Sequence, residues 1–380
     1  MTMIRFRYLC LILVVAALAG CNKTKTGFWQ GKVFDAPAEI AYRNVALDRI
    51  VLDTVNCSYE GLSGILENGN IYYIVKYFSY LYEFSPEGRL IERRLGVGRG
   101  PKETIIQHID INAFSKNGEL ALLGSNVNFD VFDNTYQAQA RFVVPYDPTT
   151  TDRERFEMYS YARDNFSCRM YEDIIYIGMI SYVRSSFNYF SHGTDFLQNS
   201  FHIGRVDWKK KITMPMMLKG HPDMYFNDSD KYYEFRCVNF DIDREGNFYV
   251  NFEADSMIYK YTLDQRPLVA FGHAGRDMDM DYMPIASLEQ VNRDLGKNRL
   301  KKGYYGTVEY IDATGYLFRS YLKGADAATD GLQIYKDGVL VGDVDVPKGF
   351  RVTGYNAPYY YSQVFEDEEA EKLTVYRFRL

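Results

Sequence analysis

The stretch NGNIYYIVKYFSYLYEFSPEGRLIER, residues 68–93, decides the fold. The turn sequences Asn68-Gly69 and Pro86-Glu87-Gly88 separate runs of alternating apolar and aromatic residues, so the order is turn, strand, strand, turn, strand. The same order recurs at residues 117–144 and again at residues 245–271. Three copies of one antiparallel meander predict a repeated β-structure.

More divergent copies extend the series at residues 173–206 and 316–342, and the two ends of the chain, 44–52 and 372–380, supply one more. Six units of roughly 50 residues lie within the repeat length of propellers. Closing such antiparallel blades into a ring leaves no free sheet edge. We therefore predict an all-β fold, a six-bladed β-propeller over residues 37–380, in which strands from both ends share one blade.

Two segments depart from the β pattern. Residues 284–296 place apolar side chains at helical intervals, at Ile285, Leu288, Val291 and Leu295. This spacing predicts one short inserted helix across a face of the propeller, followed by a basic exit over residues 297–302. The polar residues 146–165 predict a second excursion between blades.

Composition excludes some classes of function and favours β-structure. The chain has 34 Tyr and 25 Phe but only 2 Trp, which favours aromatic packing in sheets over glycan-stacking platforms, although the latter stay open. A formal net charge of -6 argues against a nucleic-acid partner. After the leader, Cys57, Cys168 and Cys237 form an odd set, which favours isolated thiols while leaving one disulfide open.

The N-terminus predicts how the protein is held in the cell. Arg5 and Arg7 precede a short apolar run that ends in Leu18-Ala19-Gly20-Cys21, which resembles a bacterial lipobox. The run is too short for a membrane span. We expect a lipoprotein signal peptide over residues 1–20, lipidation of Cys21, a tether over residues 21–36, and the membrane as a partner through that lipid.

One connecting sequence carries a resemblance to a family. Residues 95–103, LGVGRGPKE, follow a strand hairpin, and residues 271–276 form a degenerate second copy. With the lipobox and the repeats, the chain resembles the Bacteroidetes-type six-bladed β-propeller lipoproteins of the TolB-like and NHL-like superfamily, many of which have no known function. The resemblance implies the fold and an outer-membrane lipoprotein in the cell envelope. Surface-displayed members carry acidic residues after the lipidated cysteine, so the basic residues 22–26 favour the periplasmic side.

Few residues suggest chemistry. Arg99 and Lys102 in the first glycine-rich connection, and His273 and Arg276 in the second, are the candidates for binding a ligand. Asp241, Asp243 and Glu245 partly match the start of a calcium loop, but Phe252 stands where the loop needs its final acid. No histidine pair has metal-ligand spacing and no nucleophile elbow occurs, so we predict no metal, no cofactor and no catalytic residue.

The sequence favours a lipid-anchored envelope propeller that acts as a non-enzymatic binding or scaffold module. Its expected partner is a small ligand, a glycan, a peptide or an envelope protein. The alternative is a glycan-active hydrolase or lyase with carboxylates at the central funnel, because such carboxylates need no sequence motif.

Overall fold

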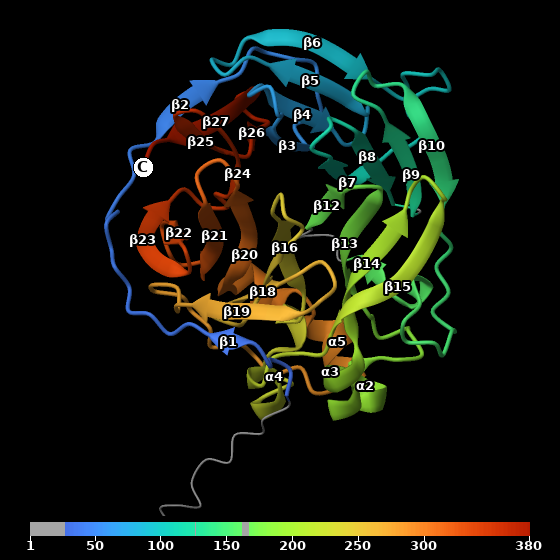
Figure 1. The fold of residues 1–380 in the computed structure, drawn as a ribbon, viewed down its shortest axis with the longest axis vertical. Helices are drawn as coiled ribbons and strands as arrows, with labels where there is room; N and C mark the ends of the chain where they lie inside the picture. The colour runs from blue at the N-terminus through green and yellow to red at the C-terminus, as the bar shows by residue number, and fades with distance from the viewer. Residues whose placement is uncertain (1–26, 126, 162–166) are drawn as a thin grey trace, which may run out of the picture.

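The computed structural model describes residues 27–125, 127–161 and 167–380, which form six sheets arranged around one central axis (Figure 1). Each sheet is a blade, and the blades follow one another along the chain as blade 1 to blade 6. The predicted six-bladed β-propeller is confirmed. The signal peptide and the lipidation site at Cys21 fall outside the described residues.

Blades 1, 2 and 3 come from the first half of the chain. Blade 1 contains β3 (Gly61–Ile65), β4 (Ile71–Val75), β5 (Tyr80–Phe84) and β6 (Leu90–Leu95). Blade 2 contains β7 (Ile109–Phe114), β8 (Leu120–Gly124), β9 (Asn128–Phe132) and β10 (Ala138–Val143). Blade 3 contains β11 (Ser160–Tyr161), β12 (Cys168–Tyr171), β13 (Ile174–Ile180), β14 (Phe201–Asp207) and β15 (Ile212–Lys219).

Blades 4, 5 and 6 come from the second half, with strands from the N-terminus added to two of them. Blade 4 contains β16 (Val238–Ile242), β17 (Phe248–Phe252), β18 (Met257–Tyr261), β19 (Pro267–Gly272) and β1 (Lys32–Val33). Blade 5 contains β20 (Lys302–Ile311), β21 (Tyr316–Gly324), β22 (Asp330–Lys336) and β23 (Val339–Val346). Blade 6 contains β24 (Val352–Asn356), β25 (Tyr359–Ser362), β26 (Phe365–Asp367), β27 (Lys372–Phe378) and β2 (Asp48–Val51).

The ring closes in blade 6, where the two ends of the chain pair. β2 lies antiparallel to β27, with Ile50 opposite Val375 and Val51 opposite Thr374. This pairing confirms the prediction that strands from both ends share one blade. The acidic turn before β27 is exposed and joins β26 to β27 as a hairpin.

The N-terminal segment runs along the outside of blades 4 and 5 before it reaches β2 in blade 6. Phe28 packs edge-on against Tyr259 of blade 4 and Trp29 packs edge-on against Tyr261, and β1 pairs in parallel with β19. Further along, the Ala41 and Tyr42 backbone amides donate to Val341 O at 2.8 and 2.9 Å on blade 5. We call residues 28–52 the outer strap. From Phe28 onward, the tether expected over residues 21–36 is docked on the ring.

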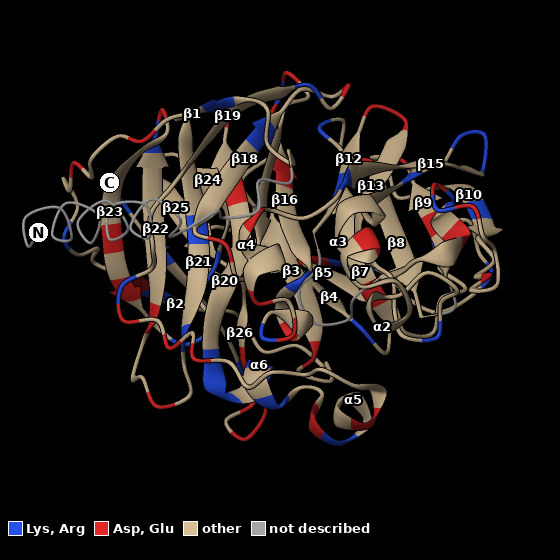
Figure 2. Ribbon diagram, turned by 90° about the horizontal axis from the view of Figure 1, so that it is seen from below, with Lys and Arg blue, Asp and Glu red and all other residues tan. Residues whose placement is uncertain are grey.

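Short helices decorate the connections between strands. They are η1 (Phe156–Met158), α2 (Tyr189–His192), α3 (Thr194–Asn199), α4 (Met224–Asn227), η2 (Tyr233–Phe235), α5 (Leu288–Asp294) and α6 (Lys297–Lys301). α5 confirms the predicted inserted helix, and Figure 2 shows α5 and α6 together at one face of the ring. The basic exit expected over residues 297–302 is instead a helix, α6, followed directly by β20. No helix in the described part of the chain is long and apolar enough to span a bilayer.

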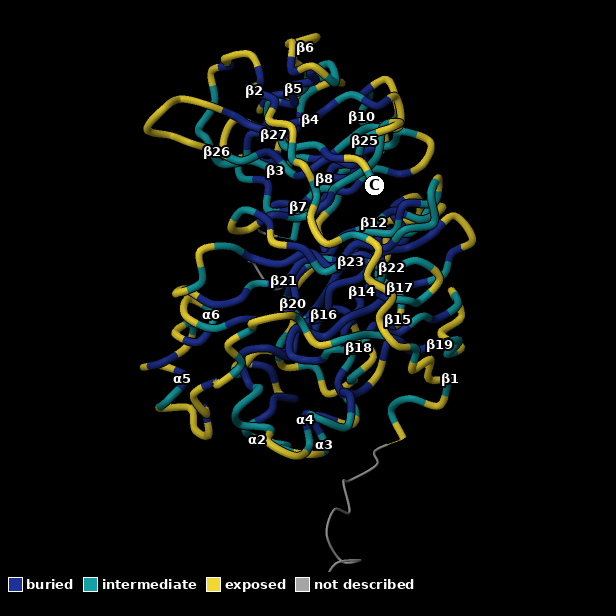
Figure 3. Tube along the Cα trace, turned by 90° about the vertical axis from the view of Figure 1, so that its left-hand side faces the viewer, coloured by how far each residue is buried: buried dark blue, intermediate teal, exposed yellow. Residues whose placement is uncertain are grey.

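The core lies between neighbouring blades, and aromatic side chains fill it. Among the described residues, the twelve largest fully buried side chains are Tyr or Phe, with Arg319 as the one exception. Phe318 of blade 5, for example, lies 4.8 Å from the ring of Tyr360 in blade 6, centroid to centroid. In Figure 3 the buried residues follow the strands, and the exposed residues concentrate in the connections. The aromatic content therefore serves packing of sheet on sheet.

The cysteines are packed as apolar residues. Cys168 on β12 and Cys237 just before β16 are both buried, whereas Cys57 is partly exposed. Cys57 and Cys168 are free thiols, and burial raises the pKa of Cys168 to about 12. A thiol with such a pKa stays protonated and unreactive at neutral pH.

Candidate functional site in the central channel

The central channel holds a cavity of about 750 Å³. Residues on or beside the first strand of every blade line it, including Ser63, Asn112, Arg169, Asp241 and Glu309. These first strands lie nearest the axis because each blade adds its later strands outward in order. A wall built from all six blades therefore surrounds one cavity along the axis.

Six polar side chains, one from each blade, stand among those that line this wall. We call these six residues the axial residues; in blade order they are Tyr72, Asn112, Arg169, Asp241, Glu309 and Arg351. They comprise two cations, two carboxylic acids, a phenol and an amide, so the lining suits a polar ligand.

Tyr72 reaches the channel from the second strand of blade 1 because the first strand has a glycine in front of it. Tyr72 on β4 is paired with Gly64 on β3, and a Cβ atom at Gly64 would lie 2.9 Å from the Tyr72 ring. The Tyr72 hydroxyl accepts a hydrogen bond from the Asn112 side-chain amide of blade 2 at 3.1 Å. Gly64 thus makes room for an axial residue.

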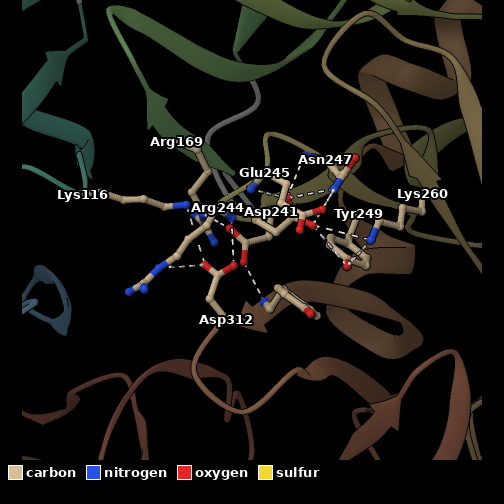
Figure 4. Close-up of polar contacts among 11 residues, drawn as sticks. Lys116, Arg169, Asp241, Arg244, Glu245, Asn247, Tyr249, Lys260 and Asp312 are labelled. Atoms are coloured by element: carbon tan, nitrogen blue, oxygen red, sulfur yellow. Dashed lines mark hydrogen bonds and ion pairs between the residues drawn. The ribbon is translucent and has the colours of Figure 1, made fainter.

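Arg169 joins three blades. Its Nε donates to Asp241 Oδ1 at 2.5 Å, and its Nη2 donates to Glu309 Oε2 at 2.8 Å. Its Nη1 donates to the Cys168 carbonyl at 3.1 Å, and Asp241 Oδ2 accepts from the Tyr310 amide at 2.7 Å. Figure 4 shows Arg169 beside Asp241, with the cluster of Lys116, Arg244 and Asp312 next to them. The guanidinium is therefore fixed by the fold before any ligand arrives.

The enclosure changes the ionisation of these groups. Burial raises the pKa of Glu309 to about 8, and repulsion from Asp241 adds to this, against the attraction of Arg169 and Arg351. The Glu309 side chain keeps 21% of its surface exposed and lines the cavity. Burial alone would lower the pKa of Arg169, yet Asp241 and Glu309 raise it above its usual value. Near neutral pH Glu309 is thus largely protonated, while Arg169 keeps its charge.

A second charged cluster lies at the rim where the first strands end. Lys116, Arg244 and Asp312 each follow the first strand of their own blade. Asp312 Oδ2 lies 3.7 Å from Lys116 Nζ and 3.8 Å from Arg244 Nε. Figure 4 shows the two cations converging on this one carboxylate. The rim carries more positive than negative charge.

The acidic residues that partly matched a calcium loop are engaged in protein contacts. Asp241 binds Arg169, whereas Asp243 Oδ1 accepts from the Glu245 and Asn247 backbone amides at 3.0 and 2.8 Å. The Asp243 bonds are those of a tight turn between β16 and β17, closed by Gly246. Among the described residues no group of three or more His, Cys, Asp or Glu side chains is placed to hold a metal.

Arg99 and Lys102 lie in the connection from β6 to β7, and both are exposed. This connection is held by the protein itself: Arg141 Nη2 donates to the Gly100 and Glu103 carbonyls at 3.1 and 2.5 Å. Neither Arg99 nor Lys102 lines the cavity. Their role in binding a ligand stays a prediction.

His273 and Arg276 lie in the connection from β19 towards α5, three blades away from Arg99. The His273 carbonyl accepts from Arg319 Nη2 at 2.8 Å, and Arg276 Nη2 pairs with Asp345 Oδ1 at 2.7 Å. Neither residue lines the cavity. The fold therefore does not bring the four candidates together, and the binding role of His273 and Arg276 also stays a prediction.

The chain is thus a six-bladed β-propeller with a polar central cavity, and its fold resembles solved structures from Bacteroides. A member of the DUF4221 family from Bacteroides vulgatus has a TM-score of 0.65 and 13% identity, over 89% of this chain and 98% of that chain. A Bacteroides fragilis protein classed as exported has a TM-score of 0.53 and 12% identity, over 91% of this chain and 99% of that chain. No family model and no curated protein matches the sequence. At these identities the likeness shows the fold alone.

Proposed function

We propose that the protein is a non-enzymatic binding module that holds a small polar ligand, such as a glycan or a short peptide, in its central cavity. The observation that carries this proposal is the convergence of one polar side chain from every blade on a single cavity of about 750 Å³. A cavity of this volume is in the range that small-molecule sites occupy.

The state of the two axial carboxylic acids favours binding over catalysis. A glycosidase needs one carboxylate as nucleophile or base and a separate acid on the other side of the scissile bond. Here Asp241 and Glu309 bind the same guanidinium, that of Arg169, at 2.5 and 2.8 Å. This arrangement fixes both groups in the wall and leaves neither set apart to attack a substrate.

The decisive experiment is a ligand screen with a matched pair of variants. Soluble saccharides and short peptides are titrated calorimetrically against the wild-type protein, Asn112→Ala in the cavity wall and Asn292→Ala on the exposed side of α5. We expect at least one ligand whose affinity falls about tenfold in Asn112→Ala and is unchanged in Asn292→Ala. Ligands that bind equally to all three proteins would place recognition outside the cavity.

We also propose that the ring is tethered to the outer membrane on its periplasmic side through lipid on Cys21. The support is the leader sequence, together with the fold shared with a Bacteroides fragilis protein classed as exported. Cys21→Ser is expected to shift the protein from the membrane fraction to the soluble fraction. Protease added to intact cells should leave the wild-type protein uncut, and digestion there would place it on the cell surface.

A further inference from the structure

Six cations of the described residues line the central cavity, and five of them lie within 4 Å of a carboxylate of the protein. Lys76 lies 2.9 Å from Glu60, and Arg94 lies 2.5 Å from Glu92. The remaining three pair with Asp241, Glu309 or Asp312 as described above, namely Lys116, Arg169 and Arg244. Each of these five cations therefore has a carboxylate partner within the fold, and Lys116 and Arg244 share the single carboxylate of Asp312.

Arg351 is the exception. No carboxylate of the described residues lies within 4 Å of its guanidinium, and the contact that fixes the residue is its backbone amide, which donates to Gln363 Oε1 at 3.0 Å. Burial lowers the pKa of Arg351 and Arg169 adds to this, which outweighs the opposite effects of Tyr72, Glu309 and Glu366. A half-buried cation that no carboxylate of the described residues pairs with is stabilised when an anion joins it.

The charge count of the axial residues limits what that anion can be. Arg169 and Arg351 supply two positive charges, and Asp241 supplies one negative charge. Protonated Glu309 supplies none, so the free site carries a surplus of one positive charge near neutral pH. A single surplus charge among the axial residues suits a monoanion, because a phosphate dianion would bring one more negative charge than these residues compensate.

We propose that the ligand of the central cavity carries a carboxylate, which Arg351 binds in the two-pronged geometry that a planar guanidinium offers to a planar carboxylate. This inference rests on the proposed function and adds the chemical class of the ligand. Tyr72 and Asn112, which stand beside each other in the wall, are placed to bind hydroxyl or amide groups on the rest of the molecule. A sugar acid and an acylated amino acid both present this chemistry.

The test uses probes that differ only in the acid group. D-glucuronate is compared with D-glucose, and N-acetylglycine with N-acetylglycinamide, by calorimetric titration of the full chain to about 1 mM. We expect at least one acid to bind about tenfold or more tightly than its neutral partner, and the successful pair distinguishes a saccharide from a peptide source. If neither acid binds, or each binds no better than its neutral partner, the inference is overturned.

Variants assign the effect to Arg351. Arg351→Met is expected to weaken the acid at least about tenfold, whereas Arg351→Lys, which keeps the charge but not the fork, should weaken it less. Arg266→Met, at an exposed turn, is the matched control and should change nothing. Circular dichroism of each variant confirms that it folds. An acid affinity that Arg351→Met leaves unchanged overturns the inference.

The same data separate this inference from the proposed function. A neutral probe that binds the wild type and is lost in Asn112→Ala would keep the cavity as the binding site while excluding the carboxylate. Binding that neither Asn112→Ala nor Arg351→Met alters would exclude both proposals.

Discussion

Arg169 of blade 3 donates through Nε to Asp241 Oδ1 of blade 4 at 2.5 Å, so that a side-chain bond at the axis connects two blades. Through Nη2 the same guanidinium also reaches Glu309 of blade 5. The strands of neighbouring blades belong to separate sheets, so contacts of this kind, together with apolar packing, hold the blades in register around the channel.

Removing Arg169 is expected to destabilise the ring. Arg169→Met leaves Asp241 buried without its cation, and breaking a buried ion pair in this way costs about 3–5 kcal/mol. Urea denaturation gives the free energy of unfolding for the wild type, Arg169→Met and the surface control Arg266→Met. A loss below about 1 kcal/mol would show that the pair contributes no more than an exposed one.

Glu309 gives the stability a dependence on pH. Its pKa is about 8 in the folded protein against a reference value of 4.5, so the folded state binds this proton more tightly than the unfolded state. The resulting contribution to stability is complete below the reference pKa and is lost as the pH rises through about 8. The Glu309→Gln variant removes this dependence on pH, because its side-chain amide does not ionise.

We therefore expect the stability of Glu309→Gln, relative to the wild type, to rise steadily between about pH 5 and pH 8. Urea unfolding of both proteins at a series of pH values measures this difference, in which other titrating groups largely cancel. A difference that does not change with pH would show that Glu309 titrates at its ordinary pKa.

The pairing of β2 with β27 in blade 6, which we call the seam, contains two neighbouring residues whose side chains face opposite ways. Ile50 on β2 is 8% exposed and lies opposite Val375, whereas Val51 is 49% exposed. Ile50→Ala is expected to cost about 2–4 kcal/mol, because it leaves a cavity between β2 and the core. Val51→Ala should stay within about 0.5 kcal/mol of the wild type in the same thermal or urea unfolding experiment. Equal losses would mean that β2 does not fasten the ring through Ile50.

Arg319 is expected to hold the second glycine-rich connection in place. It is fully buried and donates to the Ser256 and His273 carbonyls at 2.9 and 2.8 Å, as well as to Gln333. Arg319→Met removes these charge-assisted bonds and should cost about 3 kcal/mol. Hydrogen exchange should quicken at residues 273–276.

The matched control for Arg319 is Arg205→Met. Arg205 donates to the Pro215 carbonyl on the exposed side of blade 3. We expect Arg205→Met to lower the free energy of unfolding by less than about 1 kcal/mol and to leave the hydrogen exchange of residues 273–276 unchanged. Similar effects of the two variants would remove the special role of Arg319.

The outer meanders of the blades could be predicted, but most of the first strands could not. β4 and β5 are runs of mainly apolar and aromatic residues between clear turns, as are the corresponding strands of blades 2 and 4. First strands such as β12, with sequence CRMY, and β24, with sequence VTGYN, are short and carry polar or small residues because one side of them faces the channel. Their pattern is therefore not that of a half-buried strand.

The inserted helix shows that the helical spacing of apolar residues does not predict which of them are buried. The spacing predicted one packing stripe, yet only Ile285 and Val291 are buried, at 0% and 6%, whereas Leu288 and Leu295 are 51% and 57% exposed. α5 has seven residues, so a single side chain in its middle, Val291, together with Ile285 just before the helix, makes the apolar contact with the core. The helical spacing therefore predicted that a helix forms, but not how deeply each of its apolar side chains is buried.

The axial residues could not be recognised as a group, because they are spread from residue 72 to residue 351 and meet only when the ring closes. A signal was present in part: Arg169, Asp241 and Glu309 are charged residues inside strands, where apolar residues are expected. Gly64 gives no such signal, because its importance depends on Tyr72 crossing over it. The glycine-rich connections, which stand out in the sequence, owe their form to the passage from an outermost strand to the next innermost one.

The outer strap has a mechanical consequence. The chain reaches the ring at Phe28 and Trp29 on blade 4, passes blade 5, and only then supplies β2 to the seam. A force applied to the N-terminus therefore acts first on the aromatic contacts of blade 4 and then on β1, which is paired in parallel and loaded in shear. The seam between β2 and β27 lies furthest along this path. When the ring is pulled by its N-terminus, the pairing of β2 with β27, which closes the ring, is therefore the last of these contacts to bear the force.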